Sequence, residues 1–272
     1  MFPTGRLGPA DAAVMETFVV PRYLSLFGEP MLEMLLAGDA AAIAHLGCRT
    51  GYPDRLLLER VPGARITSVD VSAPALELAR NKAALMNETR LEYLLADGLP
   101  TELPDESYSH AVCLHPIATD AERAALFVEL ARLLYAGGQA LVALPLRGSF
   151  QEVGDLLREF ALKSDDGELG KAVEHMMATR ATIETLSEEL EVAGLDDVDV
   201  ELRSSKLTFD SGRAFLEDPV TRLLITPTLV AALAPHDLTR PLEYVREAVD
   251  KYWSEGKFEL SLNIGCASAR RS

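Results

Sequence analysis

Residues 41–58 have the sequence AAIAHLGCRTGYPDRLLL, which predicts a strand, a tight turn and a helix in succession. The first six residues are almost all apolar, as in a buried strand. The turn runs from Gly47 to Gly51, and Pro53 suits the first position of a helix. Glycines let the backbone approach a ligand closely, and a helix N-terminus directs unpaired N–H groups at an anionic group. This stretch therefore predicts a nucleotide-binding pocket.

A carboxylate follows the turn at a spacing that fits such a pocket. Asp70 lies 19 residues after Gly51, at the end of a second apolar run over residues 66–69. A carboxylate at this place can accept hydrogen bonds from ribose hydroxyls. Loops with two glycines four residues apart are common, so the turn alone leaves a purely structural role equally open.

Four blocks between Ala41 and Pro145 resemble the core of the class I S-adenosylmethionine-dependent methyltransferases, in the order and spacing of that family. The block HLGCRTG matches the family's glycine loop, and ITSVDVSAPALELAR matches the second strand with its helix. The block LLADGLPTELPDESYSHAVCLHP matches the adenine-binding stretch with the fourth strand, and LFVELARLLYAGGQALVALP matches the fifth strand with the preceding helix. The resemblance implies that S-adenosylmethionine is the cofactor and S-adenosylhomocysteine the product.

The resemblance also implies which residues bind the cofactor. It places Asp70 on the ribose and Asp97 on the adenine amino group. The full set of matching positions is His45, Gly47, Cys48, Arg49, Gly51, Asp70, Val71, Asp97 and Gly98. The loop departs from the family pattern twice, because His45 replaces an acid and Arg49 replaces the middle glycine. The Arg49 side chain then occupies the space of the methionine moiety, unless it points away or pairs with that moiety's carboxylate.

The order of predicted elements indicates an α/β fold. Strand-like runs at 41–46, 65–70, 91–95, 109–115 and 138–144 alternate with helices, which is typical of a parallel sheet with right-handed crossovers. Runs at 198–209 and 258–270 match the family's sixth strand and its antiparallel seventh. The prediction is a Rossmann-like, seven-stranded, mostly parallel sheet with helices on both faces and a helical lid between strands six and seven. The lid arrangement is similar to that of the malonyl carrier-protein methyltransferases.

We expect three parts along the chain. Residues 1–40 form an N-terminal helical cover with a break at Pro21 and a turn at 28–30. Tyr23 and Phe27 are candidates for the mouth of the pocket, and the alternative, which is the more common role of such aromatic residues, is packing in the core. Residues 41–209 and 257–272 form the Rossmann domain. Residues 210–256 form the helical lid.

Composition limits the partners and the compartment. The chain of 272 residues carries a formal net charge of −16, which disfavours nucleic acid and anionic membranes as partners. A small molecule, a carrier-bound substrate or a protein partner fits better. The three cysteines form no paired framework, and we find neither a signal peptide nor a long apolar run, so we expect a cytoplasmic protein. The sequence does not predict the oligomeric state.

His115 is the candidate catalytic residue. It follows the predicted fourth strand, where a neutral imidazole can take a proton from a hydroxyl or amine nucleophile. The alternative is a partly buried histidine bonded to the backbone, and a transfer that depends on alignment needs no base. His110 and His115 point to opposite faces of a strand, and no cluster has zinc spacing, so we predict no metal site.

Two functions remain open, and Arg49 distinguishes them. The first is a methyltransferase whose lid selects a small acceptor. The second is a catalytically inactive methyltransferase-like protein that serves as a binding or regulatory module. In that protein, the Arg49 guanidinium fills the methionine subsite and pairs with Asp70 or another nearby carboxylate.

Overall fold

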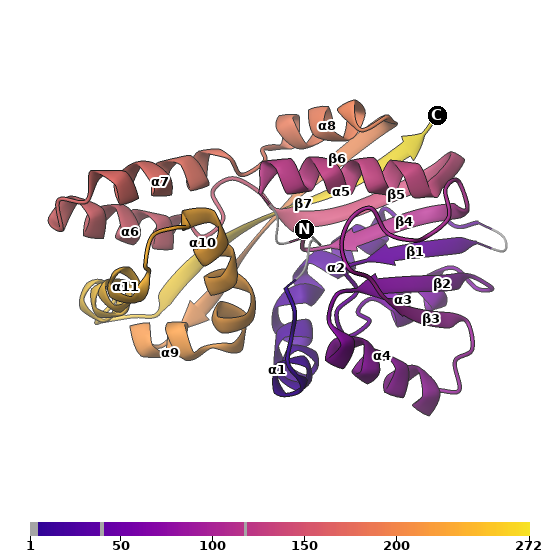
Figure 1. The fold of residues 1–272 in the computed structure, drawn as a ribbon. Helices are drawn as coiled ribbons and strands as arrows, with labels where there is room; N and C mark the ends of the chain where they lie inside the picture. The colour runs from indigo at the N-terminus through magenta and orange to yellow at the C-terminus, as the bar shows by residue number, and fades with distance from the viewer. Residues whose placement is uncertain (1–4, 39–40, 117–118) are drawn as a thin grey trace. The chain divides into compact units, whose positions relative to one another are not determined.

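The computed structural model describes residues 5–38, 41–116 and 119–272, and within them a seven-stranded sheet has the order β3-β2-β1-β4-β5-β7-β6 (Figure 1). Strands β1 to β5 pair in parallel, and β7 runs antiparallel to them. The strands are β1 Ala42–Leu46, β2 Arg65–Asp70, β3 Leu91–Leu95, β4 Tyr108–Leu114, β5 Leu134–Pro145, β6 Leu195–Phe209 and β7 Phe258–Arg271. The predicted Rossmann-like sheet with an antiparallel seventh strand is therefore confirmed.

The chain divides into two compact units. Unit 1 comprises Met1–Leu144, Ile183–Leu202 and Gly265–Ser272, and unit 2 comprises Pro145–Thr182 and Arg203–Ile264. The helices predicted between strands six and seven lie in unit 2, together with residues 145–182, which the sequence assigned to the Rossmann domain. The boundaries of the two units differ from those of the predicted domains. The role of residues 210–256 as a lid stays a prediction.

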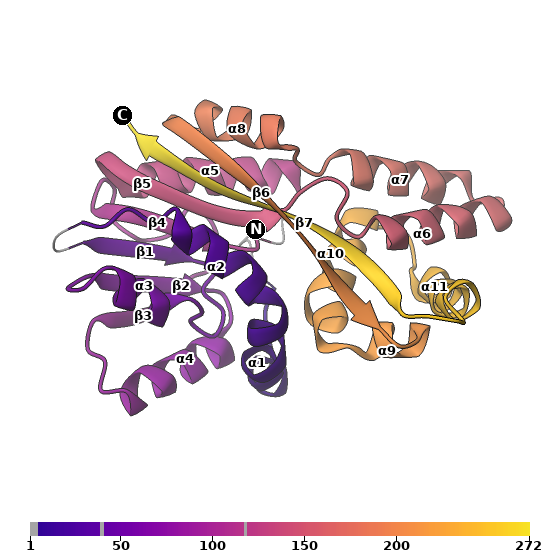
Figure 2. The ribbon, with the colours of Figure 1, turned by 180° about the vertical axis from the view of Figure 1, so that it is seen from behind.

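Helices cover both faces of the sheet in unit 1. Figure 1 shows α5 and α8 on the face toward the viewer, and Figure 2 shows α2 and α3 on the opposite face. The helical elements of this unit are α1 Pro9–Val14, the π-helix η1 Met15–Leu24, α2 Ser25–Glu33, α3 Asp54–Arg60, α4 Ala73–Leu85, α5 Asp120–Leu133 and α8 Ile183–Val192. Apolar side chains of β1 and β4 are buried between these layers, as expected for central strands of a parallel sheet.

The N-terminal segment is helical without interruption from Pro9 to Glu33, so the predicted break at Pro21 and turn at 28–30 were wrong. Pro21 lies inside the π-helix, so the residue that lacks an N–H group coincides with the change from α-helical to wider hydrogen-bond spacing and does not end the helix. Gly28 is helical, and a Cβ there would lie 2.6 Å from the Tyr52 hydroxyl oxygen. This glycine thus serves close packing and does not mark a turn.

The same segment packs over the carboxyl ends of the central strands. The N–H of Leu7 donates to the Ser72 hydroxyl just beyond β2 at 3.1 Å, and this hydroxyl donates to the Leu7 carbonyl oxygen at 2.9 Å. Glu16 forms a 2.6 Å ion pair with Lys82 of α4. These contacts place the segment over the edge of the sheet where the sequence predicted a cover, although residues 1–4 and 39–40 lie outside the described part. Its role in covering a cofactor stays a prediction.

Unit 2 is built around helices and an aromatic cluster. Its helices are α6 Gln151–Lys163, α7 Gly167–Ala178, α9 Gly212–Glu217, the π-helix η2 Thr221–Ile225, α10 Thr226–Leu233 and α11 Thr239–Tyr252. Phe215 and Phe258 pack edge to face with ring centroids 5.3 Å apart, and the ring centroid of Trp253 lies 4.9 Å from that of Phe258.

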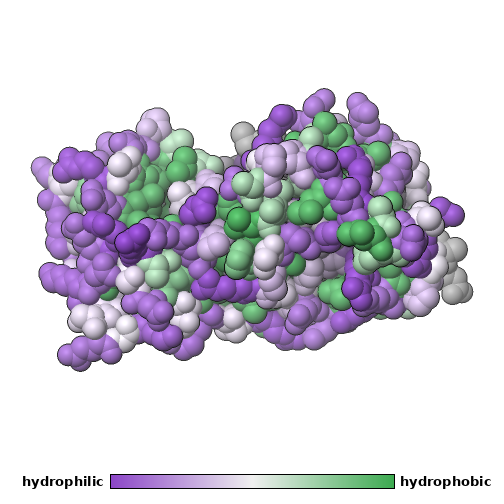
Figure 3. Space-filling model, turned by 90° about the horizontal axis from the view of Figure 1, so that it is seen from below, coloured by the Kyte–Doolittle hydropathy of each residue, from purple (hydrophilic) through white to green (hydrophobic). Residues whose placement is uncertain are grey.

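Figure 3 shows one face of the molecule, on which hydrophilic side chains interrupt the hydrophobic ones. Among the described residues, no helix is both long enough and apolar enough to span a bilayer.

Candidate active site

The loop after β1 has the backbone geometry of a glycine turn. Gly47 and Gly51 have φ values of 71° and 85°, in the left-handed region that favours glycine. A Cβ on Gly51 would lie 2.8 Å from the Tyr93 hydroxyl oxygen, so this position has no room for a side chain. Helix α3 begins at Asp54, one residue after the position predicted from Pro53. The predicted strand, turn and helix are therefore present.

Asp70 is the residue that joins this loop to the second strand. Its side chain is completely buried at the end of β2. Oδ2 accepts a 3.0 Å hydrogen bond from the backbone N–H of Arg49, and Oδ1 accepts a 2.9 Å bond from the N–H of Ser72. The structure thus brings together the glycine loop and the carboxylate that the sequence placed in one site.

The Arg49 side chain lies in the interior and is only 4% exposed. Its guanidinium donates from Nη1 to the carbonyl oxygen of Leu114 at 3.0 Å and from Nη2 to that of His115 at 2.7 Å. The hypothesis of an inactive protein predicted a pairing with a carboxylate, whereas the acceptors are backbone carbonyls at the end of β4. Burial lowers the pKa of Arg49, and the nearby charge of Asp70 opposes this shift.

A buried polar network lies beneath the loop, and its central residue, Asp54, was not among the site residues predicted from the sequence. His45 Nδ1 is 2.6 Å from Oδ1 of Asp54, and Ser68 donates to Oδ2 of Asp54 at 2.8 Å. Both His45 and Asp54 are completely inaccessible to solvent. Burial and the charge of Asp54 raise the pKa of the Tyr93 hydroxyl. His45 is therefore bonded to a carboxylate, which Asp54 supplies from the first turn of α3.

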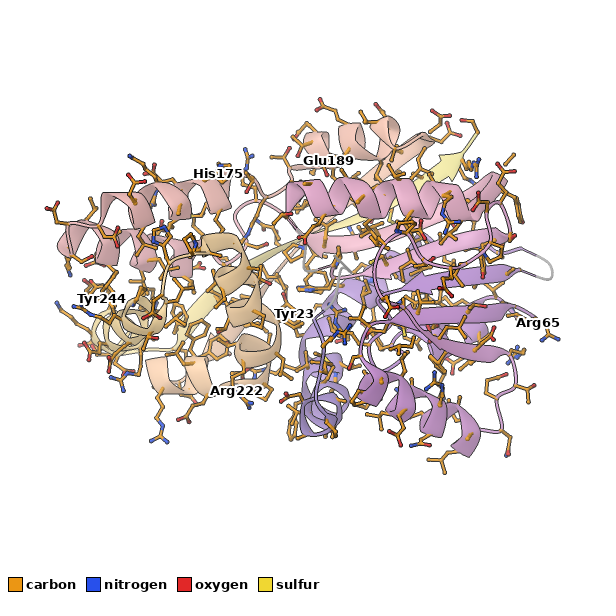
Figure 4. All side chains as sticks on the ribbon, in the orientation of Figure 1. Tyr23, Arg65, His175, Glu189, Arg222 and Tyr244 are labelled. Atoms are coloured by element: carbon orange, nitrogen blue, oxygen red, sulfur yellow. The ribbon has the colours of Figure 1, made fainter. Side chains whose placement is uncertain are left out.

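His115 lies just beyond β4 and is buried. Its φ of 50° is left-handed, which is uncommon for a residue with a side chain. The hydroxyl of Tyr23, labelled on the N-terminal helical segment in Figure 4, is 2.8 Å from Nε2. The rings of Tyr23 and Phe27 pack against the imidazole with centroids at 5.1 and 4.8 Å. The sequence named all three residues as candidates, and the structure brings them together.

Asp97 and Gly98 lie on the loop after β3. Asp97 is exposed, whereas Val71 is buried. The loop is anchored at Thr101, whose N–H and hydroxyl both donate to Oε1 of Glu129, at 2.7 and 2.6 Å. The adenine-binding role of Asp97 stays a prediction. Across the described residues, no group of three or more histidine, cysteine or acidic side chains is arranged to hold a metal ion.

We expect the cysteines of the folded protein to resist thiol reagents. Cys48, Cys113 and Cys266 are all buried, and burial raises the pKa of Cys113 to about 12 and that of Cys48 well above its ordinary value. Because the thiolate is the reactive form, Ellman's reagent at pH 8 should modify the native chain slowly. After unfolding in guanidinium, the reagent should modify all three thiols. Rapid modification of Cys48 in the native chain would show that the loop opens.

A glycine turn, a following helix and a buried acid at the end of the second strand define a nucleotide-binding domain of the Rossmann-like class. Residues 43–138 match the family model described as a methyltransferase domain. Over these residues the chain therefore resembles the class I, Rossmann-like S-adenosylmethionine-dependent methyltransferases.

Curated relatives resemble the chain over part of their length. The trans-aconitate 2-methyltransferase of Acidovorax sp. is 32% identical over 146 residues, which cover 53% of this chain and 54% of that relative. The malonyl-[acyl-carrier protein] O-methyltransferase of Acetivibrio thermocellus is 41% identical over 61 residues, 22% of this chain and 20% of that relative. The chain thus spans about half or less of the length of these relatives.

A solved structure with the same fold is the Haemonchus contortus phosphoethanolamine N-methyltransferase 2, in complex with phosphomonomethylethanolamine and S-adenosylhomocysteine. Its TM-score is 0.59 at 14% sequence identity, and the match covers 97% of this chain and 58% of that one. At this identity the likeness concerns the fold.

Proposed function

We propose that this chain is an S-adenosylmethionine-dependent methyltransferase that acts on a small or carrier-bound acceptor. The observation that carries the proposal is the bond between the Asp70 carboxylate and the N–H of Arg49, which joins the predicted ribose-binding acid to the glycine loop. When bound, the cofactor would supply an electrophilic methyl group. The inactive alternative has less support, because its predicted pairing of the guanidinium with a carboxylate is not the contact observed.

The groups at this edge of the sheet fit the cofactor's chemistry. Gly47 and Gly51 let the loop adopt its left-handed turns, Asp70 offers acceptors for ribose hydroxyls, and exposed Asp97 offers acceptors for an amino group. Because Asp70 is buried, we expect the N-terminal segment, whose Leu7 bonds to Ser72, to move aside when a ligand enters.

The relatives and His115 support a class of acceptor. The names of the two curated relatives denote acceptors that bear carboxylates, and Arg49 provides a buried cation beside β4. For an acceptor with a hydroxyl or amine nucleophile, His115 would take the proton while the Tyr23 hydroxyl bonded to Nε2 holds the imidazole in place. The protein thus contributes alignment and, where needed, a base.

Isothermal titration with S-adenosylhomocysteine tests the proposal. We expect wild type to bind and Asp70→Asn to bind about 10- to 100-fold more weakly, because a charged hydrogen-bond partner contributes about 1.5–3 kcal/mol. Asparagine keeps the shape and one acceptor oxygen but turns an NH2 group toward the other backbone N–H, so circular dichroism and urea unfolding of Asp70→Asn accompany the titration. Glu77→Gln, an exposed acid on α4, is the matched control and should bind like wild type. No heat from wild type at millimolar ligand would refute the proposal.

A further inference from the structure

Arg49 occupies a backbone position that normally suits glycine. Its φ of 49° is left-handed, and Arg49 is the third residue of the tight turn from Gly47 to Gly51. A side chain here leaves the loop toward the end of β4, where the guanidinium bonds to the carbonyls of Leu114 and His115. The position therefore places a charged group inside the site.

The guanidinium is held in a fixed orientation but not saturated. Two backbone carbonyls accept from Nη1 and Nη2, and these are its acceptors within the residues that the structure describes. A guanidinium carries more N–H donors than two bonds use. Each terminal nitrogen thus keeps one N–H group beyond the one that it donates, and an anion that reached these groups would be stabilised.

Neighbouring carboxylates already accept from other donors. The oxygens of Asp70 accept from the N–H groups of Arg49 and Ser72. Those of Asp54 are bonded by His45 and Ser68. The anion best suited to the remaining N–H groups is therefore one supplied by a ligand, and a planar guanidinium matches a carboxylate in charge and geometry.

We propose that Arg49 is the carboxylate-binding residue of this site. The inference rests on the proposed function, since the carboxylate belongs either to the amino-acid end of the cofactor or to the acceptor. Both sources share one chemistry, a carboxylate beside the end of β4. The opposite possibility is that the guanidinium obstructs the site, which predicts tighter binding once it is removed.

Titration of four proteins with three ligands tests this. The proteins are wild type, Arg49→Gly, Arg49→Lys and the control Arg55→Ala, whose exposed side chain pairs with Glu59 on α3. Glycine adopts the left-handed conformation readily, so Arg49→Gly should fold. The ligands are S-adenosylhomocysteine, 5′-methylthioadenosine, which lacks the amino-acid end, and tricarballylate, a simple tricarboxylate.

If the cofactor supplies the carboxylate, Arg49→Gly should bind S-adenosylhomocysteine about 10- to 100-fold more weakly and methylthioadenosine unchanged. If the acceptor supplies it, S-adenosylhomocysteine binding should stay unchanged and tricarballylate binding should be lost. In either case Arg49→Lys should fall between, because it keeps the charge without the planar fork. Arg55→Ala should match wild type throughout.

Tighter binding of S-adenosylhomocysteine by Arg49→Gly, or equal affinities for all ligands in both proteins, would overturn the inference. Failure of the proposed function is separate and visible, because methylthioadenosine would then not bind to wild type. The tricarballylate titration would still decide whether Arg49 binds a carboxylate.

Discussion

Asp54→Ala is expected to lower the free energy of unfolding of the protein by about 3–5 kcal/mol, because it breaks a buried pair by removing one partner. Asp54 is completely buried and joins His45 of β1 to Ser68 of β2 through bonds of 2.6 and 2.8 Å. Alanine would leave both groups in the interior without their acceptor, and each such group is costly.

Urea unfolding followed by circular dichroism measures this loss. Glu59→Ala is the matched control on the same helix, since Glu59 is 51% exposed and its pairing with Arg55 contributes at most about 0.5 kcal/mol. Asp54→Asn should fall between them, because an amide keeps one acceptor oxygen. A loss for Asp54→Ala no larger than that of the control would contradict a stabilising network beneath the loop.

The sheet could be predicted from the sequence because its signals are local. Apolar runs bounded by glycine, proline and acidic residues gave β1 and β2 to within a residue, at 41–46 and 65–70 against the observed Ala42–Leu46 and Arg65–Asp70. The link between Asp70 and the glycine loop was also predictable, because the carboxyl ends of neighbouring parallel strands meet at one edge.

The partners of the polar side chains could not be predicted in the same way. The bond between His45 and Asp54 depends on how α3 packs against two strands, and no pattern along the chain specifies that packing. An acid in the first turn of α3 is ordinarily explained by the helix dipole, so Asp54 gave no distinct signal. The direction of the Arg49 side chain likewise depends on the left-handed backbone at that residue.

His115→Asn is expected to reduce kcat/KM by about 10²- to 10⁴-fold for a hydroxyl or amine acceptor, the usual contribution of a general base. Asparagine tolerates the left-handed φ of 50° at this position, so backbone strain does not confound the result. Tyr23→Phe removes the hydroxyl bonded to Nε2 and should cause a smaller loss. Release of S-adenosylhomocysteine, measured with an acceptor found by screening small carboxylates, alcohols and amines, provides the rate.

The pH profile separates a base from a histidine that only fills space. If His115 accepts a proton, the wild-type rate falls at acid pH as the imidazole is protonated, and this acid limb disappears in His115→Asn. Titration with S-adenosylhomocysteine should give the same affinity for both proteins, because the loop and Asp70 are unchanged. His175→Asn, an exposed histidine on α7 labelled in Figure 4, is the control and should keep both rate and profile. An unchanged acid limb in His115→Asn would assign the imidazole to packing with Tyr23 and Phe27, and methyl transfer would then depend on alignment alone.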